Sequence, residues 1–278
     1  MIIREAVLLT LTLLATVLLF TPFLWLLGIV AYNGALTIIK AGPSFLIKEP
    51  PLPESNSLGG IGTVLEGSLF LVATATAIAA PLSVISALYI VIYENSPLAK
   101  LGKYLLELVV EFPTIVVGIS VFLFFGLILG LGLSSLTASI ALAIIMLPYA
   151  TVQITEALRI PKSTVYEAAA SLGLNEAHVT RIMLIEGKRG VVTGILIGMA
   201  KIFGETAPLL FTTTTSFNLY VKGFLSPVSA IPVLIFNYAF SPYDNWHDTA
   251  WGASLVLSII VLSIYLAVKL TLARGGRS

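Results

Sequence analysis

A series of long apolar segments constrains this chain more than any other feature of its sequence. A helix of about 20 apolar residues crosses the hydrocarbon core of a bilayer, because each residue adds about 1.5 Å of rise. The segments of sufficient length are Ala6–Tyr32, Gly62–Tyr93, Tyr104–Leu131, Ser134–Glu156, Gly190–Thr213 and Thr249–Leu270. The sequence therefore predicts an integral membrane protein with about six transmembrane helices.

The composition agrees with a membrane environment. Hydrophobic residues make up 58% of the chain and charged residues only 10%, whereas about a quarter of the residues in an ordinary soluble domain are charged. So few charged side chains cannot cover a surface in water, but a surface that faces lipid needs none. The net charge of +1 gives no basic surface for nucleic acid, so no nucleic-acid partner is expected.

Lysine and arginine are distributed unequally between the two sides of the predicted bundle. Eleven of the 15 such residues fall on the side of the N-terminus and three on the opposite side, while Lys201 lies within a span. Cytoplasmic loops carry the excess of positive charge. Both termini and the charged loop at 159–189 are therefore predicted to be cytoplasmic.

The motifs of common catalytic chemistry are missing from the sequence. No G-x-x-x-x-G-K-[ST] string for holding ATP phosphates occurs, there is no cysteine, and no acidic or histidine cluster has metal-ligand spacing. Asp244, His247 and Asp248 come nearest to such a cluster and are interpreted as a solvated turn. We expect a passage for a solute and not an enzyme, with no cofactor bound to this chain.

Three glycines repeat at four-residue spacing along the fifth apolar segment. Gly190, Gly194 and Gly198 would form one bare stripe on a helix. Small residues let helices approach closely in lipid. The stripe predicts a helix-packing face and no chemistry.

A charged loop in the second half of the chain carries a recognisable pattern. It contains Glu167, Ala168, Ala169 and Gly173 in the order E-A-A-x-x-x-G. This loop resembles the EAA loop of ABC importer permeases, although Glu186 stands where that family has a proline. The resemblance implies that these residues form a short helix that docks in a groove of an ATP-binding subunit.

A second pattern narrows the resemblance. The stretch Lys201–Thr212 reads KIFGETAPLLFT and is similar to the A-R-x-x-G-E-T-A-P-L-L-F-T signature of phosphate-transport permeases of the PstA type, with lysine replacing arginine. Further similar segments are Gly59–Gly62, Pro113–Gly118 and Ile231–Ala239. The resemblance runs from about residue 58 to the end of the chain.

The residues of this stretch support a substrate site on their own. Lys201 is predicted near the middle of the bilayer, where a cation is costly and marks a functional site. Glu205 lies one turn further along the helix, where it could pair with Lys201, and Pro208 should break the helix just beyond it. Thr206 and Thr212 would offer hydroxyl donors to an oxyanion. The alternative is a structural Lys–Glu pair that only locks the helix.

The resemblance implies an all-α fold, a polytopic bundle of the type-I ABC importer permease (MetI-like) kind. We expect one transmembrane permease domain over 1–278. Its parts would be an N-terminal helix and outer loop at 1–61, a core at 62–270, and a tail at 271–278.

The resemblance also implies a function and partners. The chain would form half of the translocation path for inorganic phosphate in a prokaryotic plasma (inner) membrane. Its partners would be a second permease subunit of the PstC type, a dimer of ATP-binding subunits that carry ATP and Mg²⁺, and an extracellular or periplasmic phosphate-binding protein.

Two alternatives to phosphate import remain open at this stage. The first is import of another oxyanion, such as sulfate, molybdate or phosphonate, by the same kind of machine. The second is a secondary carrier driven by an ion gradient. Such carriers usually contain two related halves, and no internal repeat is evident here.

Overall fold

The computed structural model describes residues 2–55, 57–163 and 167–273, and within these ranges the regular structure is entirely helical. This confirms the predicted all-α class. The elements are α1 (Ile2–Ala41), η1 (Pro43–Leu46), α2 (Gly62–Ile92), α3 (Pro97–Glu111), α4 (Thr114–Val121), η2 (Phe122–Ile128), α5 (Ser135–Pro161), α6 (Glu167–Ser171), α7 (Glu176–Phe203), α8 (Leu209–Thr212), α9 (Ile231–Ala239) and α10 (Asp244–Ala273).

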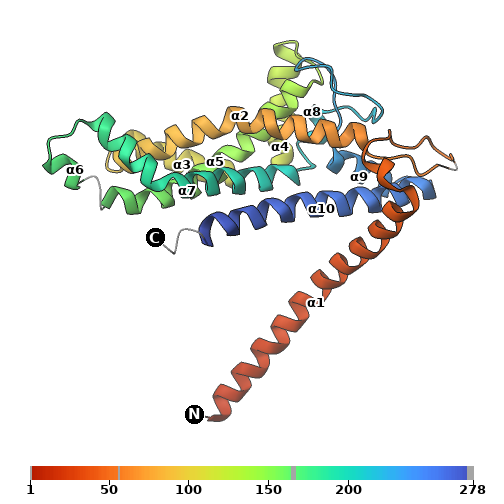
Figure 1. Ribbon diagram of the computed structural model, residues 1–278, viewed down its shortest axis with the longest axis horizontal. Helices are drawn as coiled ribbons and strands as arrows, with labels where there is room; N and C mark the ends of the chain where they lie inside the picture. Colours follow the sequence, from red (N-terminus) through yellow and green to blue (C-terminus); the bar gives the residue numbers. More distant parts are fainter. Residues whose placement is uncertain (1, 56, 164–166, 274–278) are drawn as a thin grey trace.

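The centre of the molecule is a bundle of long helices. Helix α5 packs against α2 on one side and α7 on the other, and α10 packs against α7, α9 and α1. Figure 1 shows α1 leaving the bundle at an angle, with its N-terminal part far from the other helices. That part of α1 exposes a continuous apolar surface, which suits a helix that faces lipid.

Among the described residues, four helices are long and apolar enough to cross a membrane, namely α1, α2, α5 and α10. The pair formed by α3 with the segment Thr114–Ile128 supplies a fifth span if it is counted as one, although its two parts meet at 102°. The predicted count of about six spans is therefore roughly matched.

Two of the six predicted segments are not single continuous helices. The segment Tyr104–Leu131 was expected as one span, but the chain turns sharply between Glu111 and Thr114. Proline disfavours helical geometry in the residue before it, and Phe112, which precedes Pro113, is extended with ψ 134°.

The other predicted span, Gly190–Thr213, is also interrupted. Helix α7 ends at Phe203, and the chain becomes helical again only in the short α8. The expected break before Pro208 is confirmed, but it begins earlier than predicted. Glu205 consequently follows the end of α7 and does not lie on its face.

The glycine stripe on α7 forms the contact with α5. A Cβ atom added to Gly194 would lie 2.6 Å from Cγ1 of Ile154, and one added to Gly198 would lie 2.9 Å from Cγ of Met146. A Cβ on Gly190 would overlap the Cβ of Ala157. The predicted close packing of helices along this stripe is therefore confirmed, and α5 is the partner.

The proline-rich segment after η1 folds onto the C-terminal part of α9 and the N-terminal part of α10. The backbone carbonyl of Pro51 accepts a hydrogen bond from Trp246 Nε1 at 3.0 Å and from the hydroxyl of Tyr238 at 3.4 Å. The Tyr238 and Trp246 rings stack with centroids 4.2 Å apart. Gly59 closes the segment with φ +53°, a conformation that favours glycine.

Candidate functional site

The break between α7 and α8 is the irregular backbone to which the sequence pointed. Gly204 caps α7, and the residues up to Pro208 are not part of a helix. The carbonyl of Thr206 accepts a hydrogen bond from the amide of Leu210 at 3.1 Å. Non-helical backbone at membrane depth is tolerated where protein buries it or where it lines a cavity.

Lys201 and Glu205 form an ion pair at this break. Their Nζ and Oε1 atoms are 2.6 Å apart, and the side chains are 37% and 8% exposed respectively. Lys201 lies in the last turn of α7, where the helix dipole favours a cation. Its ammonium also sits 5.5 Å from the centroid of the Tyr149 ring on α5. The carboxylate is thus buried, while the ammonium retains an exposed side.

The two predicted hydroxyl donors differ in their surroundings. Thr206 is half-buried and adjoins Glu205 in the chain. Thr212 is fully buried, and its hydroxyl donates to the carbonyl of Pro208 at 3.0 Å. Its proton is therefore used within α8. Thr206 is thus next to the ion pair in the chain, whereas the Thr212 hydroxyl is bonded to the backbone.

The segment at Pro113–Gly118, which the sequence analysis singled out, meets the α7–α8 break. A Cβ atom added to Gly118 of α4 would lie 2.5 Å from the Cα of Pro208. Only glycine permits this approach of the α4 backbone to Pro208. The sharp turn after α3 therefore brings α4 across the break, which sequence reasoning did not predict.

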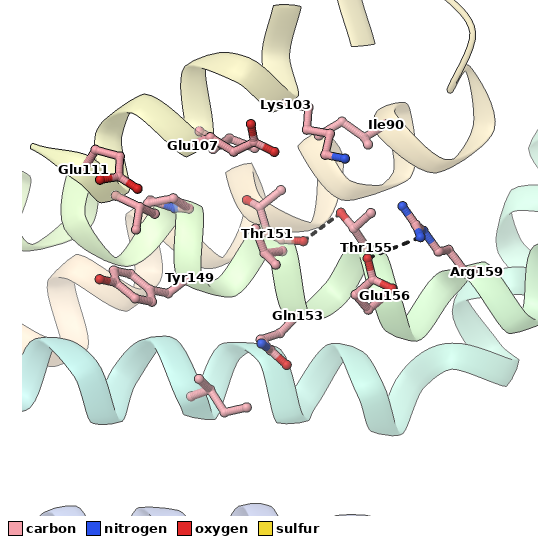
Figure 2. A pocket seen from close by; sticks show the side chains of 15 residues that line it. Ile90, Lys103, Glu107, Glu111, Tyr149, Thr151, Gln153, Thr155, Glu156 and Arg159 are labelled. Atoms are coloured by element: carbon pink, nitrogen blue, oxygen red, sulfur yellow. Dashed lines mark hydrogen bonds and ion pairs between the residues drawn. The ribbon is translucent and has the colours of Figure 1, made fainter. Parts of the chain in front are cut away.

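A cavity of about 390 Å³ lies between α3 and α5. Figure 2 shows Lys103, Glu107 and Glu111 on α3 above Tyr149, Gln153 and Glu156 on α5. Tyr149 thus lines the cavity, and the Lys201 ammonium lies over its ring. The four-residue spacing of Glu107 and Glu111 was the available sequence signal for this cavity.

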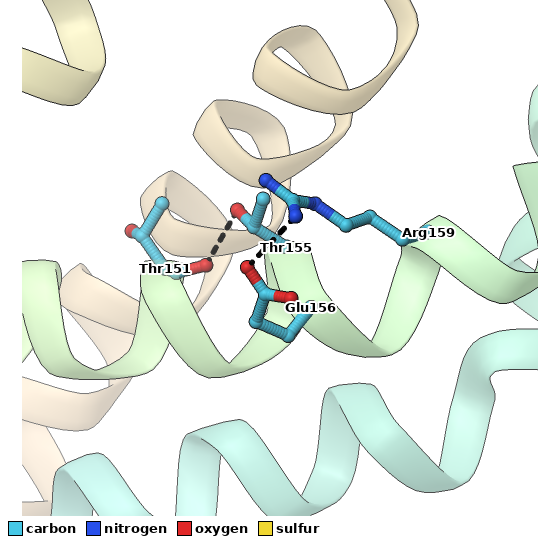
Figure 3. A network of polar contacts seen from close by, with 4 residues as sticks. All are labelled: Thr151, Thr155, Glu156 and Arg159. Atoms are coloured by element: carbon cyan, nitrogen blue, oxygen red, sulfur yellow. Dashed lines mark hydrogen bonds and ion pairs between the residues drawn. The ribbon is translucent and has the colours of Figure 1, made fainter.

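The polar side chains of α5 beside this cavity bond mainly to their own helix (Figure 3). Arg159 Nη1 lies 3.5 Å from Oε1 of Glu156, and the hydroxyl of Thr155 donates to the carbonyl of Thr151 at 2.7 Å. Both side chains of the ion pair are more than half exposed. Each of these contacts joins two residues of α5 that lie about one turn apart.

The EAA-like loop forms the short helix α6. Ala168 is exposed and Ala169 is buried, while the side chain of Glu167 lies outside the described residues. Gly173 follows the helix with φ +71°, which is the left-handed conformation typical of a C-terminal glycine. The predicted short helix is confirmed, and its docking role stays a prediction.

The described ranges contain no group of three or more His, Asp or Glu side chains that could hold a metal ion. The interpretation of Asp244, His247 and Asp248 as a solvated turn was wrong, because they form the start of α10. His247 contacts the carbonyl of Ser241 through Nε2 at 2.7 Å. His178 contacts the side chain of Asn175, which caps α7.

The fold and the site together describe a membrane permease built around a broken helix. Residues 79–273 match the family of binding-protein-dependent transport system inner membrane components, and the chain belongs to that family. A solved inward-facing structure of the MetNI methionine ABC transporter has the same fold. It aligns with a TM-score of 0.59 at 17% identity and covers 76% of this chain and 95% of the other.

Curated relatives define the type of permease more closely. The chain is 37% identical over 259 residues to the probable phosphate transport system permease protein PstA of Methanocaldococcus jannaschii, covering 92% of this chain and 89% of the relative. It is 31% identical to PstA of Haemophilus influenzae, covering 78% and 77% of the two chains. The chain is thus a permease of the PstA type, and the alternative of an ion-coupled carrier is set aside.

Proposed function

We propose that this protein is the membrane-spanning permease subunit of an ATP-driven importer and forms half of a path for inorganic phosphate. The observation that carries the proposal is the partly exposed Lys201 ammonium at a helix break, in a chain whose relatives are phosphate permeases. A charged lysine at membrane depth normally faces a cavity or a substrate.

The proposed role of each residue follows from its surroundings. Glu205 holds the ammonium by one end, and the exposed side of the ammonium attracts an oxyanion as a point charge. Thr206 adds a hydroxyl and backbone groups beside it. Thr212 acts on the path only if its hydroxyl leaves the Pro208 carbonyl. The permease makes and breaks no covalent bond.

The proposed partners supply energy and substrate. Two ATP-binding subunits would hold ATP and Mg²⁺ and hydrolyse the nucleotide, with Glu167, Ala168, Ala169 and Gly173 forming the docking helix. A second permease of the PstC type would complete the path. An extracellular or periplasmic phosphate-binding protein would deliver the anion to the outer side.

The proposed orientation places both termini and the loop at 159–189 in the cytoplasm of a prokaryotic cell. The cysteine-free sequence allows single introduced thiols to be probed. The proposed orientation puts Phe240, whose side chain is 81% exposed, on the outer side. In intact cells, an impermeant thiol reagent should therefore label Phe240→Cys. It should reach Lys100→Cys only after lysis. Labelling of Lys100→Cys from outside contradicts the orientation.

Transport by the purified complex in proteoliposomes tests the substrate and the energy source. Phosphate uptake should require ATP on the cytoplasmic side and should persist when ionophores collapse ion gradients. An excess of sulfate, molybdate or phosphonate should compete poorly with labelled phosphate. Uptake that another oxyanion suppresses at equal concentration would assign the permease to that anion.

A further inference from the structure

The cytoplasmic end of α2 contacts both ends of the segment that contains α6. Glu94 Oε1 lies 3.0 Å from Nζ of Lys162, the residue that follows α5. The hydroxyl of Tyr93 donates to Oε2 of Glu176, the first residue of α7, at 2.9 Å. Two consecutive residues after α2 therefore hold the chain immediately before and immediately after the α6 region.

The loop that carries these two residues is itself well fixed. The amide of Ser96 donates to the carbonyl of Tyr93 at 2.9 Å, and the hydroxyl of Ser96 caps α3 by accepting from the amide of Ala99 at 3.0 Å. The rings of Tyr89 and Tyr93 contact each other with centroids 5.1 Å apart. The loop therefore moves together with the end of α2.

The same helix reaches the α7–α8 break with its N-terminal half. Helix α2 has 31 residues, so its length is about 46 Å. Its Leu71 and Val72 line one small cavity together with Phe203 and Leu209, which flank the break. Close-packed interiors transmit displacements of their members. Helix α2 thus connects the surroundings of α6 with the surroundings of Lys201.

We propose that Tyr93 and Glu94 form a clamp that passes movements of the α6 segment to α2 and, through α2, to the helix break beside Lys201. Both are positioning residues and touch neither substrate nor nucleotide. The proposal rests on the proposed function in one respect, which is that an ATP-binding subunit moves α6.

The strength of each contact sets the expected size of the effect. Exposed ion pairs and hydrogen bonds contribute little individually, and the Glu94 side chain is 61% exposed. The Lys162 side chain is only 23% exposed. Its contact with Glu94 is therefore more restricted in geometry than a contact of a fully solvated lysine would be. Because the two contacts hold opposite ends of one segment, loss of both should exceed the sum of the single losses.

The test uses the whole importer with Tyr93→Phe, Glu94→Gln and the double variant. The measured quantities are assembled complex, basal ATP hydrolysis, and phosphate transported per ATP hydrolysed. Phosphate transported per ATP hydrolysed is called the transport ratio. Each single change should lower the transport ratio by about twofold and the double change by about tenfold. Assembly and basal hydrolysis should remain, because the buried helix contacts are untouched.

A charge exchange and a matched control complete the design. Combining Glu94→Lys with Lys162→Glu should restore the ratio that either change alone reduces. Lys100→Gln removes an exposed lysine from the first turn of α3 and should leave the ratio unchanged.

The outcomes separate the clamp from the proposed function. A double variant with the wild-type ratio overturns the clamp. Loss of assembly that the charge exchange does not repair also overturns it, since the contacts would then serve folding alone. A wild-type complex that binds no ATP-binding subunit overturns the proposed function and the clamp with it.

Discussion

Replacing Lys201 separates a transport role of its ion pair with Glu205 from a purely structural one. Lys201→Met leaves a carboxylate that is 8% exposed without its cation. Removing one member of a buried ion pair costs about 3–5 kcal/mol. Since the Lys201 side chain is 37% exposed, we expect a value near the lower end, about 3 kcal/mol.

The reverse change should cost less. Glu205→Gln leaves an ammonium that is partly solvated and still lies over the Tyr149 ring. Partly exposed charges are worth about 1 kcal/mol or less, so Glu205→Gln should be destabilising by about 1 kcal/mol. The double neutral variant removes both charges and should recover most of the stability lost in Lys201→Met.

Thermal unfolding of the assembled complex and phosphate uptake in proteoliposomes measure the two roles separately. Lys201→Met should abolish uptake, and the double variant should regain stability without regaining uptake. Lys201→Arg should retain uptake, because its positive charge persists and its guanidinium can still pair with Glu205. Uptake by the double neutral variant at the wild-type rate would refute the assignment of Lys201 to the phosphate path.

Three further predictions concern packing, coupling and pH. Gly190→Ala should destabilise the complex by about 1–3 kcal/mol, because the new methyl overlaps α5, whereas Gly102→Ala, which has open space, should leave Tm unchanged or raise it. Gly173→Val should strain the left-handed turn after α6 and reduce co-purification of the ATP-binding subunit or its coupled hydrolysis, and wild-type values for both would contradict the role of this turn. The Lys162 ammonium, which donates a hydrogen bond to Glu94, holds the pKa of that carboxylate below its ordinary value, with Arg159 adding a smaller effect. The contribution of this ion pair to stability should therefore be fully present above the ordinary pKa of Glu94. It should be lost only as the pH falls through the lowered pKa. Between about pH 6 and 8 this pair should therefore cause no change in the transport ratio. A change with pH in that window that disappears in Glu94→Gln would contradict the ionised Glu94–Lys162 pair.

Local features were sufficient to predict the membrane class, the short α6 helix and the packing stripe. Because apolar residues are in excess, most of the surface of the protein must face lipid and not water. Gly173 ends α6 because its φ of +71° is accessible to glycine. The glycines of α7 recur at helical spacing, so a packing face was readable without knowledge of its partner.

The ion pair was predictable in kind but not in geometry. Four-residue spacing suggested a Lys201–Glu205 contact, and Pro208 suggested a break. That α7 ends before Glu205, so that the pair spans the helix terminus, was visible only in the structure, where α8 packs against α4 and α5.

Tertiary structure alone decided the contacts between distant segments. Gly118 meets Pro208 across 90 positions of the chain, and Tyr93 meets Glu176 across 83. Neither contact leaves a periodic signal, because each depends on the angle at which whole helices cross. Sequence by itself thus determined the membrane class and the apolar segments through hydrophobicity, and it indicated the break before Pro208 through backbone preference. Only the packing of the long helices decided the geometry of the α7–α8 break, the α3–α5 cavity and the contacts at the C-terminal end of α2. The reason is that side-chain complementarity between helices sets their crossing angles.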